Sequence, residues 1–573
     1  MNSADQKSGA QLLYDALVQQ GVNVIFGYPG SDMLPFYDQL YDSPHIRHIL
    51  VRHEQAAAHA ADGYARVSDV PGVCMATSGP GSTNLVTGIA AAFADSVPIV
   101  ALTFNASSEY SGKGVFQEVD IRSITKTIVK KSWRIQSVEE ISLYVQEAFQ
   151  EAMRYPRGPV LIDIPSDVLK KSTQSASQDV IKYNDEGKKI LSEEECVSFF
   201  SLLSNAKRPV FIAGSGIIQS NSSEQFQRLV EQINVPVTST VSGVGSISET
   251  HSLALEVAGV LGTPYANSAL QQADLIVAWG MHFEPRSTAK PDFFAPNARI
   301  IQIDINHGVC GRFIQPTLCL NGEIHSIIDQ ILHDSRLSAI HASSHWLEQI
   351  ALWKHSCALS YDKHSSSLQP PMIMEALELL APRIRIFSGN GLHKYWALRH
   401  FHYQYPCQFN TNSRFGAMGF ALPGAVGASI ALPSESIVVI TGDGDIQMTI
   451  QELATIVELQ VPLKILVFNN GSLGAIRQHQ HFSYEKRFIG SSFEKRLPIA
   501  AIAREYGIPS EIISQNNQIE SAVERALEHK GPYLVDCIIH PDTFLDKKIS
   551  ISESLDALVC PVEAIIDNTR DLA

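Results

Sequence analysis

Short apolar runs alternate with amphipathic stretches along most of this 573-residue chain. Residues Ala10 to Gln20 have the periodicity of a helix, and Val24 to Phe26 is a short apolar run typical of a buried strand. The segment from Arg52 to Arg66 predicts another helix, whose many small residues allow close packing against a neighbour. Strands that alternate with helices indicate parallel sheets. Further strands are predicted over residues 49–51, 73–76, 210–213, 235–239, 275–279, 300–305, 384–387, 437–440 and 463–468.

Two polar stretches divide this pattern into three parts. Residues 171–187 are rich in serine, glutamine and lysine and lack an apolar period, and residues 341–369 form a second polar connector. Such composition is typical of interdomain linkers. The sequence therefore predicts an α/β protein with three doubly wound parallel-sheet domains over residues 1–170, 188–340 and 370–545, and a C-terminal tail over residues 546–573.

Composition excludes several functional classes. No apolar run approaches the roughly 20 residues that span a bilayer. The N-terminal residues lack a basic region followed by an apolar one, so no secretory signal is expected. The net charge of −15 disfavours nucleic acid and anionic membranes as partners. We therefore expect a cytoplasmic protein that binds small molecules.

The eight cysteines are scattered along the chain, and none forms a CxxC pair. This spacing disfavours a zinc site and a disulfide framework. The sequence therefore predicts reduced thiols.

The stretch from Thr441 to Asn470 predicts a strand, a turn, a helix and a second strand. Asp443 follows the first strand in a Gly-Asp-Gly turn, and Asn470 follows the second. Both side chains are thus expected at the carboxyl ends of neighbouring parallel strands, where such sheets bind ligands. Their oxygens suit Mg²⁺, which shares its remaining positions with water and ligand phosphates.

Two further segments of the N-terminal part carry candidate ligand-binding residues. Glu54 follows a predicted strand and begins a helix, where the helix dipole alone could favour a carboxylate. The glycine-rich loop from Thr77 to Asn84 lies between a strand and a helix. Its glycines allow the backbone to approach a ligand, and the helix that follows offers unpaired N–H groups.

Several motifs together resemble one enzyme family. A GDG turn followed, after one helix and one strand, by Asn469-Asn470 resembles the diphosphate-anchoring motif of thiamine diphosphate (ThDP) enzymes. GYPG, RHEQAAAHAADGYAR, TSGPGSTN, FQEVD and GPVLIDIPSDV occur in the order and spacing of the acetohydroxyacid (acetolactate) synthase branch. The resemblance runs from about residue 8 to 540 and implies pyrimidine-binding, central and diphosphate-binding domains.

The resemblance implies a set of cofactor contacts. Asp443, Asn470 and the backbone carbonyl of Ser472 would hold Mg²⁺ against the diphosphate. Glu54 would share a proton with N1′ of the aminopyrimidine ring and so promote removal of the thiazolium C2 proton. The carbonyls of Gly391 and Gly416 would face the aminopyrimidine, and Met418 would support the bend of the cofactor. The other implied cofactor-binding residues are Pro29, Gly30, Thr77, Asn84, His393, Gly442, Gly444, Asp445, Leu473 and Gly474.

Four other positions match substrate or catalytic positions of the family. Phe116, Gln117 and Lys130 would lie near the substrate, although a core residue, a loop residue and a solvated charge are the alternatives for the three. His479 stands where the biosynthetic enzymes usually carry a tryptophan associated with 2-ketobutyrate as second substrate. Because the imidazole is smaller and polar, the resemblance implies a different acceptor pocket.

The central domain resembles one that binds FAD in this family. Gly214, Gly216, Arg286, Asp304 and Ile305 fall on matching positions. The family pattern GxRFDDR reads GMHFEPR over residues 280–286, and its MHG segment reads VLG over residues 260–262. A central domain with FAD and one without a ligand both remain open.

The resemblance thus implies a ThDP- and Mg²⁺-dependent carboligase that decarboxylates a 2-keto acid, with pyruvate the first candidate, and adds the fragment to a second carbonyl compound. A 2-keto acid decarboxylase, a carboligase with another acceptor and a non-catalytic ThDP-fold subunit are the alternatives. A homodimer or homotetramer is expected, because the two outer domains meet across a dimer interface in the family. Nothing in the sequence indicates a separate regulatory subunit, although one is compatible with it.

Overall fold

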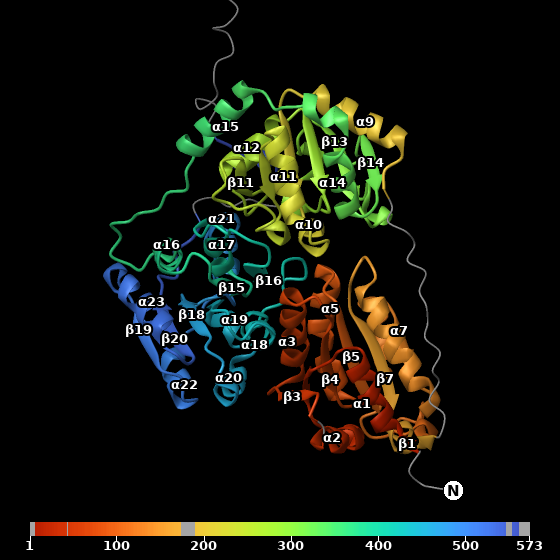
Figure 1. Cartoon of the computed structure of the whole chain (residues 1–573). Coiled ribbons are helices and arrows are strands. Elements are labelled where there is room, and N and C mark those ends of the chain that lie inside the picture. The colour runs from red at the N-terminus through yellow and green to blue at the C-terminus, as the bar shows by residue number, and fades with distance from the viewer. Residues whose placement is uncertain (1–5, 43, 174–189, 546–552, 561–573) are drawn as a thin grey trace, which may run out of the picture.

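The computed structural model describes residues 6–42, 44–173, 190–545 and 553–560. These residues fold into three six-stranded sheets covered by helices, and all neighbouring strands within each sheet are parallel (Figure 1). A short antiparallel pair joins β1 (Lys7–Ser8) to β8 (Ser172–Thr173). The predicted linker 171–187 lies outside the described residues from position 174 on, and only residues 553–560 of the predicted tail are described.

The N-terminal sheet has the strand order β3-β2-β4-β5-β7-β6. Counted along the chain within this sheet, the order is 2-1-3-4-6-5. Its strands are β2 (Val24–Tyr28), β3 (Arg47–Leu50), β4 (Gly72–Ala76), β5 (Ile99–Asn105), β6 (Ser132–Arg134) and β7 (Val160–Pro165). The helices are α1 (Gly9–Gln19), α2 (Leu34–Tyr41), α3 (Glu54–Val67), α4 (Pro80–Asn84), α5 (Val86–Asp95), α6 (Ile121–Thr125), α7 (Ile141–Met153) and α8 (Ser166–Lys170).

The C-terminal sheet repeats this plan, with the order β16-β15-β17-β18-β20-β19, again 2-1-3-4-6-5 when counted within the sheet. Its strands are β15 (Arg385–Ser388), β16 (Phe409–Thr411), β17 (Ile437–Gly442), β18 (Lys464–Asn469), β19 (Ser510–Ile513) and β20 (Tyr533–Ile538). The helices are α16 (Pro370–Leu380), α17 (Leu392–Arg399), α18 (Ala421–Ala431), α19 (Asp443–Ile446), α20 (Leu453–Leu459), α21 (Gly474–Ser483), α22 (Ile499–Glu505) and α23 (Ile519–Glu528).

The central sheet has a different order, β11-β10-β9-β12-β13-β14, which is 3-2-1-4-5-6 within the sheet. This is the order of dinucleotide-binding doubly wound folds. Its strands are β9 (Pro209–Ala213), β10 (Val237–Ser239), β11 (Ala254–Val257), β12 (Leu275–Trp279), β13 (Arg299–Asp304) and β14 (Leu318–Asn321). The helices are α9 (Glu193–Ser204), α10 (Ser215–Gln219), α11 (Ser223–Ile233), α12 (Pro264–Gln272), α13 (Pro285–Thr288), α14 (Ile324–Leu332) and α15 (Ser344–Ser356). The predicted fold class is thereby confirmed.

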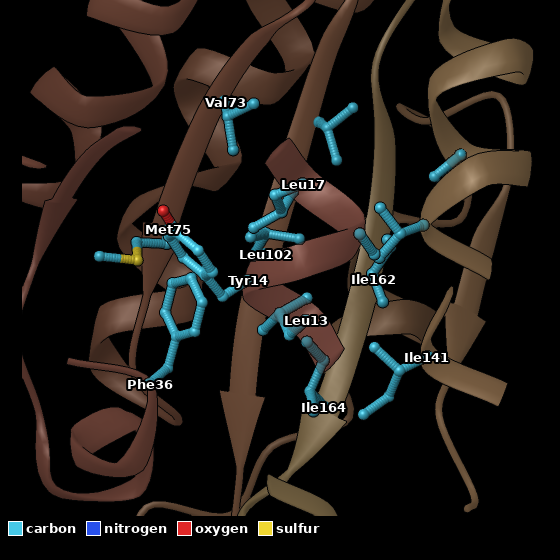
Figure 2. Packing of buried hydrophobic residues seen from close by; sticks show 14 of the residues in the cluster. Leu13, Tyr14, Leu17, Phe36, Val73, Met75, Leu102, Ile141, Ile162 and Ile164 are labelled. Atoms are coloured by element: carbon cyan, nitrogen blue, oxygen red, sulfur yellow. The ribbon is translucent and has the colours of Figure 1, made fainter. Parts of the chain in front are cut away.

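Each sheet packs its helices over an apolar core. In the N-terminal domain, Leu13 and Leu17 of α1 lie against Leu102 and Ile162 of the sheet, and Phe36 of α2 closes one end of the cluster (Figure 2). These five side chains are fully buried, so the apolar periodicity of α1 reflects this contact.

The N-terminal and C-terminal domains meet through α3 and α18. A Cβ atom on Gly63 would lie 2.0 Å from the carbonyl oxygen of Gly424, and one on Gly427 would lie 1.9 Å from that of Ala60. Both helices need their small residues because their backbones approach this closely. The alanine-rich face predicted for the α3 segment therefore packs against a helix of the other domain.

Two expectations differ from the structure. The segment 341–369, predicted as a polar connector, contains α15, and its Trp346, Ile350 and Trp353 pack into an apolar cluster of the central domain. The expectation that all cysteines are reduced is wrong, because Cys310 pairs with Cys319 and Cys357 with Cys560 in disulfides. The second pair is 203 residues apart in sequence, and only the fold brings its members together. None of the helices in the described ranges is long and apolar enough to span a bilayer.

Candidate active site

The C-terminal sheet places its candidate residues at its topological switch point, where ligands bind in such sheets. Strands β15 and β17 lie side by side, and the chain leaves them in opposite directions along the sheet. Gly391 follows β15, Asp443 follows β17, and Asn470 follows the adjacent β18. The predicted positions of Asp443 and Asn470 at strand ends are therefore confirmed.

A cavity of about 280 Å³ opens at these strand ends, and we call it the Asp443 cavity. Four segments of the C-terminal domain that are distant in sequence line it, together with Arg286 of the central domain. The predicted cofactor-binding residues among them are Gly391, His393, Gly416, Met418, Gly442, Asp443, Gly444, Asp445, Asn470, Ser472, Leu473 and Gly474. Every cofactor-binding residue that the sequence assigned to the C-terminal domain thus lines one cavity.

The oxygen atoms at the base of this cavity fit a hard cation. Asp443 is 1% exposed, and its Oδ2 has no hydrogen-bond partner among the described residues. Burial raises the pKa of Asp443 to about 6, since the charged form is poorly solvated there. Asn470 Oδ1 accepts a 3.0 Å hydrogen bond from the Ser472 amide, which orients the side chain toward the loop. A buried carboxylate with one oxygen free of hydrogen bonds from the described residues, beside an amide oxygen, is a donor set that Mg²⁺ prefers.

Asp445 and His393 shape the walls of the cavity. Asp445 accepts hydrogen bonds from the Asn390 amide (3.1 Å), the Gly419 amide (3.0 Å) and the Thr441 hydroxyl (2.7 Å), so it ties two loops to the end of β17. Burial lowers the pKa of His393 to about 4, which keeps the imidazole neutral, and its Nε2 lacks a partner within the described part of the chain. A ligand in the cavity would therefore meet a neutral imidazole.

A second group of predicted residues gathers at the corresponding switch point of the N-terminal sheet. Glu54, 9% exposed, accepts a 2.9 Å hydrogen bond on Oε2 from Nδ2 of Asn84. A Cβ on Gly81 would lie 3.3 Å from Glu54 Oε1 and 2.8 Å from Cγ2 of Thr77, and a Cβ on Gly30 would lie 2.3 Å from the Thr77 side chain. Glycine at both positions leaves room beside the carboxylate.

The chain was compared with protein families and with curated proteins. It matches the models of the thiamine pyrophosphate enzyme family, a synonym of ThDP enzyme: the N-terminal TPP binding domain over residues 7–124, the central domain over 198–331 and the C-terminal TPP binding domain over 389–537. It is 38% identical over 546 residues to the acetolactate synthase large subunit of Cyanidium caldarium, covering 93% of each chain. It is 35% identical over 531 residues to the acetolactate synthase isozyme 2 large subunit of Escherichia coli K12, covering 92% of this chain and 95% of that one.

The chain belongs to the acetolactate synthase large-subunit branch of the ThDP enzymes. This confirms the resemblance seen in the motifs. It is thus a ThDP-dependent carboligase of the acetolactate synthase type, a class that forms carbon–carbon bonds.

The residues that match substrate positions of the family do not all lie beside the two groups described above. Gln117 (φ 60°) lies against the loop before Asn84, the hydrogen-bond partner of Glu54. A Cβ atom on Gly79 of this loop would lie 2.8 Å from the carbonyl oxygen of Gln117. Phe116 is 85% exposed, and Pro29 is also exposed. His479 lies one turn beyond Ala475 and Ile476, which line the Asp443 cavity, and its exposed ring packs edge-on against Tyr484 at 5.5 Å.

Lys130 is not grouped with Glu54 by its contacts. Its Nζ donates to the carbonyl oxygens of Glu151 and Arg154 and lies 3.3 Å from the Glu151 carboxylate, all at the C-terminus of α7. A cation is stabilised at that end of a helix. Burial lowers the pKa of Lys130. These contacts favour a structural role for Lys130.

The switch point of the central sheet carries a second cavity, of about 120 Å³, which we call the central cavity. Gly216, Arg286, Asp304 and Ile305 of the predicted FAD residues line it, and Gly214 does not. Cβ atoms on Gly214 and Gly216 would collide with Gly280, so close packing of β9 and β12 explains both glycines. Burial raises the pKa of Asp304 to about 6 and lowers that of His282 to about 4.

Sequence reasoning missed one buried cation in this wall. Lys394 lines the central cavity, is 2% exposed, and donates through Nζ to Oδ1 of Asn390. Burial lowers the pKa of its ammonium group to about 8. Asn390 lies in the loop before α17 and Lys394 lies in the first turn of that helix, so no helical spacing in the sequence pointed to this contact.

Proposed function

We propose that this enzyme decarboxylates a 2-keto acid, with pyruvate the first candidate, and joins the resulting two-carbon unit to a second carbonyl compound. The Asp443 cavity carries this proposal, since it assembles a buried carboxylate whose Oδ2 has no partner among the described residues, an amide oxygen and a glycine-lined wall at one switch point. The relatives named above are acetolactate synthases, which supports the same reaction class.

The residues of the Asp443 cavity would bind and orient ThDP. The Asp443 carboxylate, the Asn470 amide oxygen and the Ser472 carbonyl would hold Mg²⁺, which in turn neutralises the diphosphate. The carbonyls of Gly391 and Gly416 would face the aminopyrimidine, above Met418. When bound, ThDP supplies a thiazolium carbon that adds to the keto acid and accepts the electron pair released with CO₂.

Glu54 would hold the proton at N1′ of the aminopyrimidine. The hydrogen bond from Asn84 to Oε2 fixes the rotation of the carboxylate, so that Oε1 faces the space beside Gly81. General acid–base catalysis requires a carboxylate held in one orientation, and this hydrogen bond supplies that orientation.

We further propose that two copies of the chain form the working site. The residues lining the Asp443 cavity all fall between positions 286 and 476, so Glu54 does not reach the cavity of its own chain. Large apolar side chains beside both half-sites are exposed, Phe116 at 85%, Phe415 at 51% and Ile476 at 52%. Exposed apolar surface of this kind is typical of protein interfaces. A homodimer, or a tetramer built from it, would cover these side chains and bring Glu54 to the partner's cofactor.

FAD is our proposed ligand of the central cavity. The sheet order 3-2-1-4-5-6, the position at its switch point and the guanidinium of Arg286 support a dinucleotide. The cavity also shares Asp95, Ser215 and Ser413 with an adjoining cavity of about 420 Å³, which lengthens the groove. Acid denaturation of the purified protein should release free flavin, and the absorbance of this flavin should be proportional to the amount of protein chain. Protein that stays colourless and does not take up added FAD would contradict this assignment.

A cytoplasmic location also remains our prediction from the sequence. The two disulfides of the structure make it testable, since a reducing compartment would keep those four cysteines as thiols. Alkylation of free thiols in intact cells, followed by mass spectrometry, distinguishes the two states.

Product analysis tests the proposed reaction. Incubation of the protein with pyruvate, ThDP and Mg²⁺ is expected to give acetolactate, which NMR detects. Acetaldehyde and CO₂ without acetolactate would instead identify a decarboxylase. Absence of turnover with pyruvate and with other 2-keto acids would favour a non-catalytic subunit.

The acceptor preference should depend on His479. Because an indole offers apolar surface to an ethyl group, His479→Trp is expected to raise the share of the 2-ketobutyrate product about 10-fold in competition with pyruvate. The exposed position of His479 predicts little change in thermal stability. An unchanged product ratio would show that this side chain does not contact the acceptor.

A further inference from the structure

Glu452 is a buried carboxylate of the C-terminal domain that contacts the chain just before Glu54. It ends the short helix η9 (Ile450–Glu452) and is 1% exposed. Its Oε1 accepts a 2.9 Å hydrogen bond from the backbone N–H of Arg52, and its carboxylate also accepts one from the N–H of His53. Its Oε2 accepts a 2.7 Å bond from the Thr455 hydroxyl. Three hydrogen bonds, from Arg52, His53 and Thr455, thus end on this one buried carboxylate.

The two backbone donors are the residues that lead into the helix carrying Glu54. His53 is the N-cap of α3, and its Nδ1 accepts a 3.1 Å hydrogen bond from the Gln55 amide. Glu54 is the first residue of α3. The bonds from Arg52 and His53 to Glu452 therefore fix the backbone on one side of Glu54, and the helix fixes it on the other.

A carboxylate is a costly choice at this position unless its charge is used. Burial raises the pKa of Glu452 to about 7, although the bonds from Thr455, Arg52 and His53 act in the opposite direction. The neighbouring contact between α3 and α18 is made by alanine and glycine, so apolar packing alone can join these domains. The carboxylate adds acceptors for two backbone N–H groups that the helix cannot satisfy.

We propose that Glu452 is a positioning residue that sets the place of the Glu54 carboxylate relative to the cofactor. This inference rests on the role proposed for Glu54. The segment η9–α20 that carries Glu452 connects β17, which ends before Asp443, to β18, which ends before Asn470. In the proposed dimer, the structural unit that holds the metal ligands of one site thus clamps the carboxylate that serves the other site.

The chain offers a matched control. Glu458 lies on α20, is largely exposed, and pairs with the guanidinium of the same Arg52 whose backbone Glu452 binds. Glu458→Gln therefore removes one negative charge and one contact to Arg52 without touching the backbone before Glu54. Exposed pairs of this kind contribute little to stability.

The test measures exchange of the C2 proton of bound ThDP in D₂O, with quench and NMR detection, on the intact enzyme. Glu452→Gln keeps the shape of the side chain and is expected to slow this exchange about 10- to 100-fold, since small misplacements of a catalytic group cost factors of this size. The ThDP dissociation constant and the melting temperature should stay close to those of the wild type. The Glu458→Gln variant should show the wild-type rate of C2-proton exchange. The Glu452→Asp variant should show a rate between those of Glu452→Gln and the wild type.

Parallel measurement of Glu54→Gln separates the two hypotheses. If Glu54→Gln slows exchange and Glu452→Gln does not, the positioning role is wrong and the role of Glu54 stands. If neither substitution slows exchange, the proton-transfer role of Glu54 is wrong, and the positioning role of Glu452 that rests on it is wrong as well. If Glu452→Gln does not fold, Thr455→Val removes one anchor of the carboxylate, and a slower exchange at unchanged cofactor affinity is again required.

Discussion

Glu54→Gln is expected to lower turnover about 10²- to 10⁴-fold, the usual contribution of a positioned acid–base group. Glutamine has the same shape and can still accept the hydrogen bond that Asn84 donates to Glu54. It cannot exchange a proton with N1′ of the aminopyrimidine. Cofactor affinity should change little, because the residues proposed to hold the diphosphate and Mg²⁺ lie in the other domain. Steady-state rates with pyruvate, together with a ThDP titration by fluorescence, measure both quantities.

A charge-matched control is Glu109→Gln in the same domain. Glu109 lies in a short exposed helix, Ser108–Tyr110, so its loss changes the net charge by the same amount at the surface. Its turnover should equal that of the wild type. Wild-type turnover in Glu54→Gln would rule out a proton-transfer role for Glu54, and a large loss of ThDP affinity would turn that role into one of binding.

Local pattern predicted the elements that position the site. The turn with Asp443 and the pair Asn469-Asn470 could be placed at adjacent strand ends because one helix separates two apolar runs, and this spacing leaves only a parallel βαβ unit. The edge strands β11 and β14 of the central sheet were not predicted, since they have four residues each and mixed burial. Short edge strands carry too little periodicity to be recognised.

Roles that depend on tertiary contact could not be predicted from the chain. Gly214 and Gly216 match ligand-binding glycines, yet the backbone of Gly280 accounts for both. Lys130 matches a substrate position, yet it donates to carbonyls at the end of α7. Glu452 accepts from the backbone of Arg52, which is 400 residues away in sequence. In each case the partner comes from another element, and no spacing in the sequence encodes it.

Asp443→Asn should weaken binding of the Mg²⁺–ThDP pair by at least about 100-fold. This effect exceeds the one expected when a residue that only hydrogen-bonds to a metal ligand is lost, because Asp443 is proposed to bind the metal directly. The substitution keeps an oxygen at the same place but removes the charge that attracts the cation. Calorimetric titration of ThDP at saturating Mg²⁺ measures the effect. Asp542 is an exposed residue of the same domain that pairs with Arg477. The control variant Asp542→Asn should bind ThDP with the affinity of the wild type. Equal affinity in Asp443→Asn and the wild type would place the metal elsewhere.

Because both substitutions are expected to impair turnover, the two variants together test whether the site lies between chains. In a mixed dimer of Glu54→Gln and Asp443→Asn chains, one site would combine both substitutions, and the other would combine the intact Glu54 of one chain with the intact Asp443 of its partner. Random pairing makes half of the dimers mixed, so co-expression should restore about a quarter of wild-type turnover. Sites formed within one chain would recover nothing, since each chain would carry its own defect. Recovery near a quarter would therefore establish that Glu54 acts on the cofactor held by the partner, the arrangement that the exposed apolar side chains beside both half-sites favour.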